Sequence, residues 1–157
     1  MATLAHVHEA FSLVSRYLPD DISTVHDYGF GDGAGTQWLN SRYSNVVGYD
    51  ITMEHAERRQ TTGVDLRIGD VRYPQDDADL IYVGHILEGV HYQYTDQPVL
   101  VERLRTHCRY LLLQVHHDQG DVWAWQDSFV TSAIVHSDYT CGLGRADSVT
   151  LLRGYLP

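Results

Sequence analysis

Residues 27–36 constrain the fold of this chain more than any other stretch, because they read DYGFGDGAGT and carry a glycine at every second position from 29 to 35. β-Branched residues precede this stretch in residues 22–28, and apolar side chains follow it at helical spacing from Trp38 to Tyr43. Glycine adopts positive φ angles without the steric cost that other residues meet, and it lets a ligand approach the backbone closely. The pattern therefore predicts a strand, a tight turn and a helix. The turn either binds a nucleotide-like ligand or is a simple βα connection.

Strands and helices alternate along most of the chain. A leading amphipathic helix is expected within residues 1–20, where apolar residues recur every three or four positions until Pro19. Several later strands are apolar on both faces, which is typical of a parallel sheet covered on both sides by helices. Strands are predicted at residues 46–50, 64–68, 80–83 and 110–115, and helices after Thr52 and between Asp96 and Cys108.

The C-terminal part of the chain breaks this alternation. Residues 123–135 match a helical spacing of apolar side chains, whereas residues 139–143 and 149–152 read as two short strands. Residues 144–147 between these strands have the length of a hairpin link. We therefore expect one α/β domain over residues 1–157 that closes with an antiparallel hairpin, since the chain length is near the roughly 150 residues of a typical domain.

The net charge, hydropathy and cysteine content of the chain argue against several classes of function. The formal net charge is −10 and all 11 basic residues are arginines, which argues against a nucleic-acid backbone as the main partner, since that backbone needs a basic surface. A nucleic acid bound locally by arginines is left open. No apolar stretch reaches the roughly 18 residues of a membrane span, and no secretory signal is recognisable. Cys108 and Cys141 form neither a disulfide framework nor a zinc motif. These features favour a cytoplasmic protein with no membrane or nucleic-acid partner, and they leave a homo-oligomer open.

Three aspartates stand at the ends of successive predicted strands. Asp27 ends the first strand, Asp50 the second and Asp70 the third. A carboxylate after the second strand can accept hydrogen bonds from both hydroxyls of a ribose. The carboxylate of Asp70 could accept one from an exocyclic adenine amine. Three carboxylates around one glycine turn therefore predict a site for a nucleoside-containing ligand.

Four ordered segments of the chain resemble the class I S-adenosylmethionine-dependent methyltransferases. They are residues 25–39, where an acidic residue precedes GxGxG, and residues 48–50, 68–71 and 79–88. The resemblance covers essentially the whole chain, because that family also ends in an antiparallel hairpin. It implies a Rossmann-like, doubly wound, mostly parallel seven-stranded sheet with helices on both faces. It also implies S-adenosylmethionine as cofactor, S-adenosylhomocysteine as product, and methyl transfer to a small molecule.

The same resemblance implies roles for residues beside the methionine and ribose of the cofactor. Gly29, Gly31 and Gly33 would form the floor beneath it. Asp27 would lie near the methionine portion, and Asp50 would hold the ribose. The cofactor carries a sulfonium and an ammonium, so an acidic site suits it where a phosphate would require cations.

At the adenine, the resemblance places Asp70 at the exocyclic amine and Ile51 and Val71 on the two sides of the ring. Tyr28 and Phe30 are candidates for an aromatic wall facing the cationic groups. Ordinary packing in the core is the equal alternative for these two aromatic residues.

His85 is the best candidate for a catalytic base, because it follows the fourth strand at the lip of the site, with Glu88 one turn further on. A base is required only when the nucleophile is reluctant, as a hydroxyl is. A hydrogen-bonded structural role is the alternative for His85. Where the family often has a second histidine, this chain has Gly89, which weakens inference about the acceptor.

The residues after Gly89 bear on the acceptor. His91, Tyr92 and Tyr94 could line its pocket or form a solvent-facing loop. The Pro-Pro-aromatic motif of methyltransferases that act on nucleic-acid amino groups is missing, so a small-molecule acceptor is favoured. Residues 116–118 read His-His-Asp, but adjacent residues of an extended chain point to opposite sides, so a polar loop is expected there and no metal site is predicted.

Two other functions compete with methyl transfer. The glycine pattern and Asp50 also fit a dinucleotide-binding reductase, although Asp70 has no place in that fingerprint and little chain remains for a substrate domain. The short chain also suits a protein that binds S-adenosylmethionine without methylating, as a sensor, a sequestering factor or a degrading factor.

Overall fold

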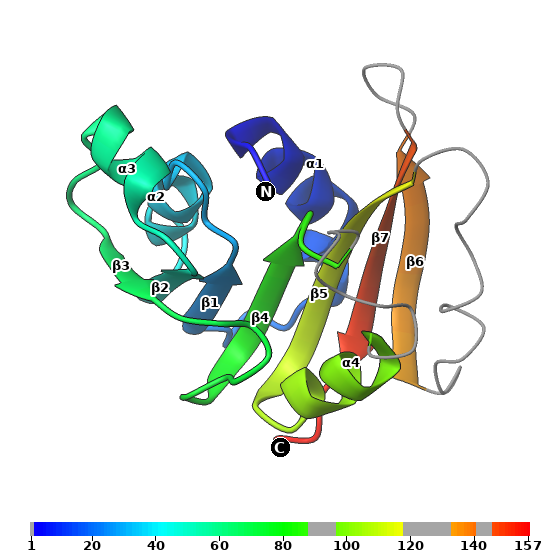
Figure 1. The fold of residues 1–157 in the computed structure, drawn as a ribbon. Coiled ribbons are helices and arrows are strands. Elements are labelled where there is room, and N and C mark those ends of the chain that lie inside the picture. Colours follow the sequence, from blue (N-terminus) through cyan, green and yellow to red (C-terminus); the bar gives the residue numbers. More distant parts are fainter. Residues whose placement is uncertain (1, 88–96, 118–132, 141–145) are drawn as a thin grey trace.

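A seven-stranded mixed sheet forms the centre of the molecule, with strand order β3-β2-β1-β4-β5-β7-β6 (Figure 1). The computed structural model describes residues 2–87, 97–117, 133–140 and 146–157. Neighbouring strands from β3 to β5 pair in parallel, and β7 pairs antiparallel with both β5 and β6. The strands are β1 (Thr24–Tyr28), β2 (Asn45–Asp50), β3 (Asp65–Ile68), β4 (Ala78–Gly84), β5 (Cys108–His117), β6 (Ile134–Thr140) and β7 (Ala146–Arg153).

The described helices are short. They are α1 (Leu4–Val14), followed directly by the 3-10 turn Ser15–Tyr17, then α2 (Ala34–Asn40), α3 (Glu54–Arg59) and α4 (Gln97–Arg105). In the described part of the chain, no helix has the length and apolar character needed to cross a lipid bilayer. The helix expected at the start of the chain is confirmed: it is α1, which ends before Pro19.

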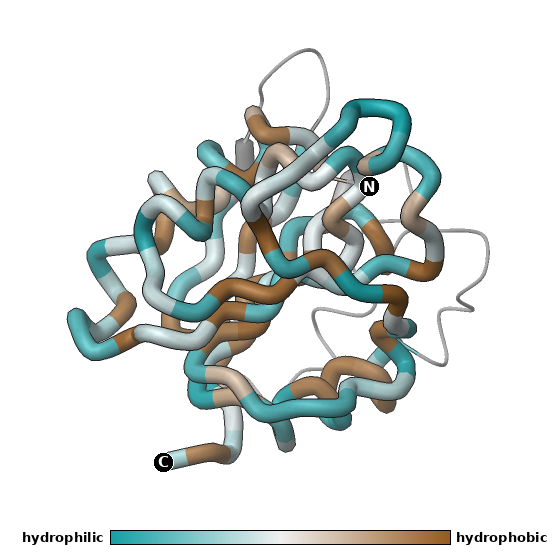
Figure 2. Tube along the Cα trace, turned by 90° about the vertical axis from the view of Figure 1, so that its left-hand side faces the viewer, coloured by the Kyte–Doolittle hydropathy of each residue, from teal (hydrophilic) through white to brown (hydrophobic). Residues whose placement is uncertain are grey.

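Two hydrophobic clusters lie on the two faces of the sheet. One joins Leu100, Val101 and Leu104 of α4 to side chains of β1, β4 and β5. The other joins α1 and α2 to the alternate residues of the same strands, with Leu80 and Leu112 among them. Figure 2 shows the hydrophobic residues concentrated along the central strands. Both faces of β4 and β5 are buried, which explains why these strands are nearly continuous apolar runs.

The strand, turn and helix predicted around residues 27–36 are confirmed, as are the seven strands and the closing antiparallel pair. Two predicted boundaries near the C-terminus were wrong, the first of them at the start of β6. Ile134 and Val135, assigned to a helix from their spacing, begin strand β6. They are β-branched and pair with β7 through Ile134 and Leu152, and this tertiary pairing overrides the helical pattern.

A second correction concerns the hairpin link. Ala146 and Asp147 were expected between the strands, but both belong to β7, where they pair with His117 and His116 of β5. The same pairing places His116 and His117 in a strand, not in the polar loop that the sequence suggested.

Two valines of α4 provide a matched test of the packing beneath this helix. Val101 is 0% exposed, whereas Val99 is 61% exposed. We expect Val101→Ala to lower the free energy of unfolding by about 1–3 kcal/mol, because it removes buried apolar surface. Val99→Ala should change it by less than about 0.5 kcal/mol. Urea unfolding followed by circular dichroism measures both, and equal effects would contradict the packing described for α4.

Candidate active site

The glycine turn after β1 is built from left-handed backbone. Gly29, Gly31 and Gly33 have φ angles of 84°, 58° and 80°, values that favour glycine strongly over other residues. The N–H of Gly29 donates to the carbonyl of Tyr49 at 2.7 Å, which fastens the turn to the end of β2. A Cβ atom at Gly29 would lie 2.6 Å from Cδ1 of Ile86, so the segment after β4 also lies against this turn.

Asp27 is a buried carboxylate at the base of the turn. Its side chain is 2% exposed, and Oδ2 accepts a hydrogen bond from the hydroxyl of Thr36 at 2.7 Å. Oδ1 is buried and has no hydrogen-bond partner among the described residues. Burial raises the pKa of Asp27 to about 6, and the nearby Asp50 adds to the increase while the bond from Thr36 opposes it. The base of the turn therefore holds a buried carboxyl oxygen to which no described residue donates.

Asp50 is the last residue of β2 and lies beside the same turn. Its Oδ2 accepts a hydrogen bond from the N–H of Gly31 at 3.0 Å. Because parallel strands end at one edge of the sheet, β1 and β2 bring Asp27 and Asp50 to the same edge. The structure thus brings together the glycine turn and two of the three aspartates that the sequence singled out.

The third aspartate, Asp70, forms an ion pair with Arg72. Both carboxylate oxygens of Asp70 accept hydrogen bonds from the Arg72 side chain, with distances of 2.5–3.0 Å, and these bonds lower the pKa of Asp70. An adenine amine at Asp70 would have to compete with this ion pair. Of the two residues expected to enclose the adenine, Ile51 is 67% exposed and available, whereas Val71 is 4% exposed and belongs to the core.

Tyr28 and Phe30 lie inside the protein, each 2% exposed. The ring of Tyr28 stacks on that of Tyr49 with centroids 5.0 Å apart, and Phe30 lies against Gly48, where a Cβ atom would be 3.0 Å from its ring. These contacts correspond to the packing alternative. Because both side chains are buried, they are not exposed as a wall for a ligand in this structure.

His85 follows β4 at the same edge of the sheet. It has a φ angle of 54°, an uncommon conformation for a residue other than glycine, and its N–H donates to the carbonyl of Gln114 at 2.9 Å. Nε2 lies 3.1 Å from Oδ2 of Asp147 in β7. The ring of His6 in α1 lies against that of His85, with centroids 4.2 Å apart. Burial, and next the neighbouring His85, lower the pKa of His6.

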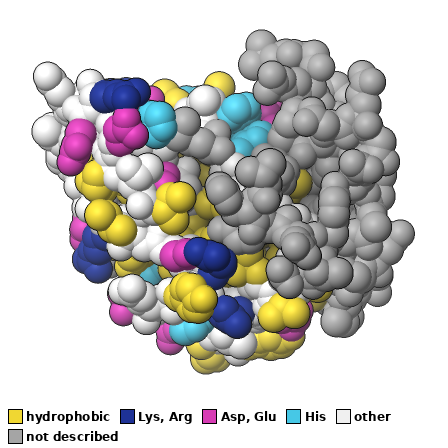
Figure 3. Space-filling model, viewed as in Figure 1, with side chains coloured by type: hydrophobic (Ala, Val, Ile, Leu, Met, Phe, Trp, Pro, Cys, Tyr) yellow, Lys and Arg dark blue, Asp and Glu magenta, His cyan; other side chains and the backbone are white. Residues whose placement is uncertain are grey.

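Sequence reasoning missed His6 and Asp147 as partners of His85. Asp147 also accepts a hydrogen bond from Nε2 of Gln114 at 3.2 Å, and Oε1 of Gln114 accepts one from the hydroxyl of Tyr82 at 2.7 Å. These groups come from α1, β4, β5 and β7, so no local motif signals them. Figure 3 shows histidine side chains reaching the surface near the upper edge of the molecule, in the region of α1 in Figure 1.

Other residues expected near the acceptor lie outside the described part of the chain. These are Glu88, His91, Tyr92 and Tyr94. Gly89, and Asp118 of the expected polar loop, also lie outside it.

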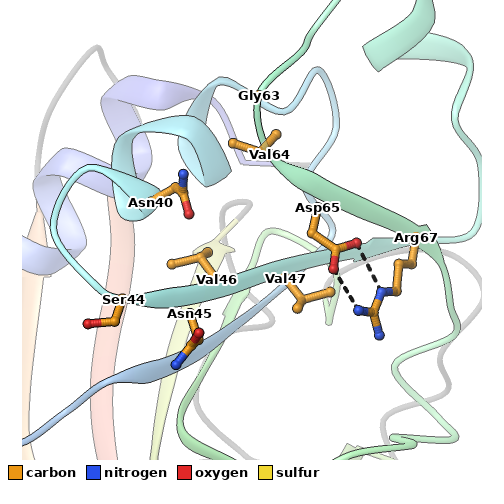
Figure 4. Close-up of a pocket in the computed structure, with 9 residues that line it drawn as sticks. All are labelled: Asn40, Ser44, Asn45, Val46, Val47, Gly63, Val64, Asp65 and Arg67. Atoms are coloured by element: carbon orange, nitrogen blue, oxygen red, sulfur yellow. Dashed lines mark hydrogen bonds and ion pairs between the residues drawn. The ribbon is translucent and has the colours of Figure 1, made fainter.

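A separate groove lies at the opposite ends of β2 and β3 (Figure 4). It encloses about 600 Å³ and is lined by the end of α2, the first residues of β2 and the segment from Gly63 to Arg67. Asp65 and Arg67 pair within it, with Nε donating at 3.0 Å. Since Val47 pairs with Asp65 whereas Asp50 pairs with Ile68, this groove is separate from the edge that carries the glycine turn.

The part of the chain that contains the glycine turn matches a known family. Residues 26–109 match a family model described as "Methyltransferase domain". This span is more than half of the chain and includes Asp27, Asp50 and His85. The comparison with curated proteins found no match.

Solved structures resemble this fold over nearly its whole length. The magnesium protoporphyrin IX methyltransferase of Synechocystis PCC 6803 with bound SAM is 15% identical, has a TM-score of 0.76, and is matched over 97% of this chain and 79% of its own. The N-methyltransferase NodS of Bradyrhizobium japonicum WM9 with SAH is 14% identical, with a TM-score of 0.72 and coverage of 97% and 86%. CalS10, an amino pentose methyltransferase of Micromonospora echinaspora with bound SAM, is 15% identical and has a TM-score of 0.69. The match covers 96% of this chain and 92% of the chain of CalS10.

The family model covers the glycine turn and all three aspartates. A shared fold at such low identity does not identify an acceptor. The match over residues 26–109, carried on this seven-stranded sheet, shows that the chain belongs to the class I S-adenosylmethionine-dependent methyltransferase family.

Proposed function

We propose that this chain binds S-adenosylmethionine at the carboxyl ends of β1 and β2 and transfers its methyl group to a small-molecule acceptor. The observation that carries the proposal is the buried carboxylate of Asp27, whose Oδ1 has no donor among the described residues. An unsatisfied buried polar atom is costly. A ligand that brings a positively charged donor to this oxygen would satisfy it.

The surroundings of Asp27 fit a cationic ligand better than an anionic one. Asp50 lies close enough to raise the pKa of Asp27, so the turn carries two acidic groups where a pyrophosphate would need positive charge. We assign the floor of the site to Gly29, Gly31 and Gly33. Asp27 would then meet the methionine ammonium and Asp50 the ribose hydroxyls, with one carboxylate oxygen of Asp50 retained by the turn.

At the adenine end of the proposed site, the role of Val71 differs from the one expected from the sequence. Ile51 offers an exposed apolar side chain next to Asp50, so it would contact one side of the ring. Asp70 would accept from the exocyclic amine only if its pairing with Arg72 loosens. Val71 would contribute through its backbone position beside Asp70, because its side chain lies in the core.

When bound, S-adenosylmethionine supplies a methyl group on a sulfonium that is already a good leaving group. The protein then has to align the acceptor and exclude water. We place the acceptor beside His85, which could accept a proton from a hydroxyl or an amine. Asp147, 3.1 Å from Nε2 of His85, would stabilise the resulting imidazolium. Glu88 stays a proposed second group at the acceptor.

The acceptor is proposed to be small. The solved neighbours described above are named for a porphyrin and an amino pentose, and the net charge of −10 opposes binding of a nucleic-acid backbone. A cytoplasmic location is proposed because the two cysteines of the chain form no disulfide framework, as suits a reducing compartment.

Binding and turnover are tested in two steps. Calorimetry should show one-to-one binding of S-adenosylmethionine and S-adenosylhomocysteine, whereas binding of NAD with no response to either would overturn the proposal. Incubation with methyl-labelled cofactor and small-molecule extract of the native host should then transfer label to an acceptor. Stoichiometric binding without transfer, or breakdown of the cofactor without an acceptor, would instead indicate a sensor or a degrading enzyme.

Asp50→Ala should weaken binding of S-adenosylhomocysteine by about 1–3 kcal/mol, or roughly 5- to 150-fold, because it removes charge-assisted ribose contacts. Asp50→Asn keeps an acceptor for the Gly31 N–H and should lose less. Asp65→Ala makes the same charge change at the start of β3, beside the separate groove, and should bind normally. Calorimetric titration measures all three, and unchanged affinity in folded Asp50→Ala would remove Asp50 from the site.

The pKa of Asp27 predicts a pH dependence of binding. Its carboxyl is neutral below about pH 6 and charged above it, so affinity for the cationic cofactor should rise as pH increases through this value and level off near pH 7. Asp27→Asn cannot ionise and should bind weakly, without this step. Titrations from pH 5 to 8 compare the two proteins, and an identical pH profile in the variant would refute the assignment.

A further inference from the structure

We propose that His6, His85 and Asp147 form a binding site for a divalent first-row transition-metal ion, with zinc as the reference ion. One ligand atom from each side chain lies within 4.8 Å of the other two. The three residues come from α1, from the end of β4 and from β7. Two imidazoles and one carboxylate are a ligand set that such ions bind in proteins.

The distance between the ligand atoms of His85 and Asp147 is already near that of a metal site. Two ligands about 2.1 Å from one zinc ion at a tetrahedral angle lie about 3.4 Å apart. Nε2 of His85 and Oδ2 of Asp147 are 3.1 Å apart, so an ion can bridge them with little movement. The ligand atom of His6 lies within 4.8 Å of both of these atoms, so it is placed to act as the third protein ligand. The side chains of His85 and Asp147 are 9% and 6% exposed, so the ion would be largely withdrawn from water.

Hydrogen bonds outside the three ligands hold two of them in orientation. Nδ1 of His6 accepts the N–H of Thr3 at 3.0 Å, which leaves Nε2 as its ligand atom. Nε2 of Gln114 donates to Asp147 at 3.2 Å, and Gln114 is held in turn by the hydroxyl of Tyr82. Partners of this kind orient the ligands of protein metal sites.

The backbone at His85 supports a functional position. Its φ angle of 54° is left-handed, and non-glycine residues held in this region cluster at functional sites. The bond from its N–H to the carbonyl of Gln114 maintains that conformation. The neighbouring strand thus directs the imidazole toward Asp147.

Metal binding does not rest on the proposed methyl transfer. Three protein ligands leave a coordination position open, and the site lies at the edge of the sheet where β4 ends. An ion bound to Nε2 of His85 would keep the ring proton on Nδ1, so the ring could no longer accept a proton from the acceptor. An acceptor oxygen at the open position would then be polarised by the ion instead of losing its proton to the ring.

The test uses the full chain with Zn²⁺ in calorimetry and Co²⁺ in visible absorption, at a pH where histidine is neutral. We expect one saturable site in the wild type, with the absorption bands of four- or five-coordinate Co²⁺. His6→Ala and Asp147→Asn should each bind at least about tenfold more weakly. His55→Ala removes an exposed histidine of α3 and should bind as the wild type does.

His6→Ala and Asp147→Asn remove different ligands, so if one variant does not fold, the other still tests the metal site. His6 lies on the half-buried side of α1, and Asn at position 147 can still meet Gln114. Circular dichroism checks that each variant is folded. A wild type without a saturable site overturns the proposal, and so do folded His6→Ala and Asp147→Asn that bind like His55→Ala. Binding of S-adenosylhomocysteine, measured separately, reports on the proposed function, so either idea can fail alone.

Discussion

The bond between Asp50 and the N–H of Gly31 is the contact on which the rest of the site depends. It holds a turn of left-handed glycines against the end of β2, at 3.0 Å. With the bond from Gly29 to Tyr49, it aligns the ends of β1 and β2, so Asp27 and Asp50 share one edge. A side chain at Gly29 would also collide with Ile86, so the same turn determines how closely the segment carrying His85 approaches.

Electrostatics give this edge its chemical character. A buried carboxylate beside a second carboxylate is unfavourable in the free protein, above all where no described residue donates to one of its oxygens. The raised pKa of Asp27 expresses that cost. A cationic ligand lowers the cost, whereas an anionic ligand increases it. The charge of the chain as a whole has less influence, because most of its aspartates lie elsewhere and several, such as Asp65 and Asp70, are paired with arginines.

Local sequence predicted the strands and helices well where the residue types and the spacing of apolar residues indicated the same element. At β1, β4 and β5, β-branched or apolar runs end at polar residues or glycine, and the strands lie there. At residues 134–135 the signals conflicted, because helical spacing coincided with β-branched residues, and pairing with β7 decided for a strand. Tyr28, Phe30 and Val71 show a similar limit: a motif locates the backbone, but packing decides whether a side chain faces the ligand or the core.

The sequence by itself determined the alternating α/β sheet, the glycine turn and the positions of Asp27, Asp50 and His85 at strand ends, because period and glycine placement are local properties of the chain. Only the tertiary structure decided that Tyr28 stacks on Tyr49. It alone also brought His6 and Asp147 to His85. The physical reason is that these contacts join elements far apart in the chain, whose meeting depends on strand order and on the register of β5 with β7.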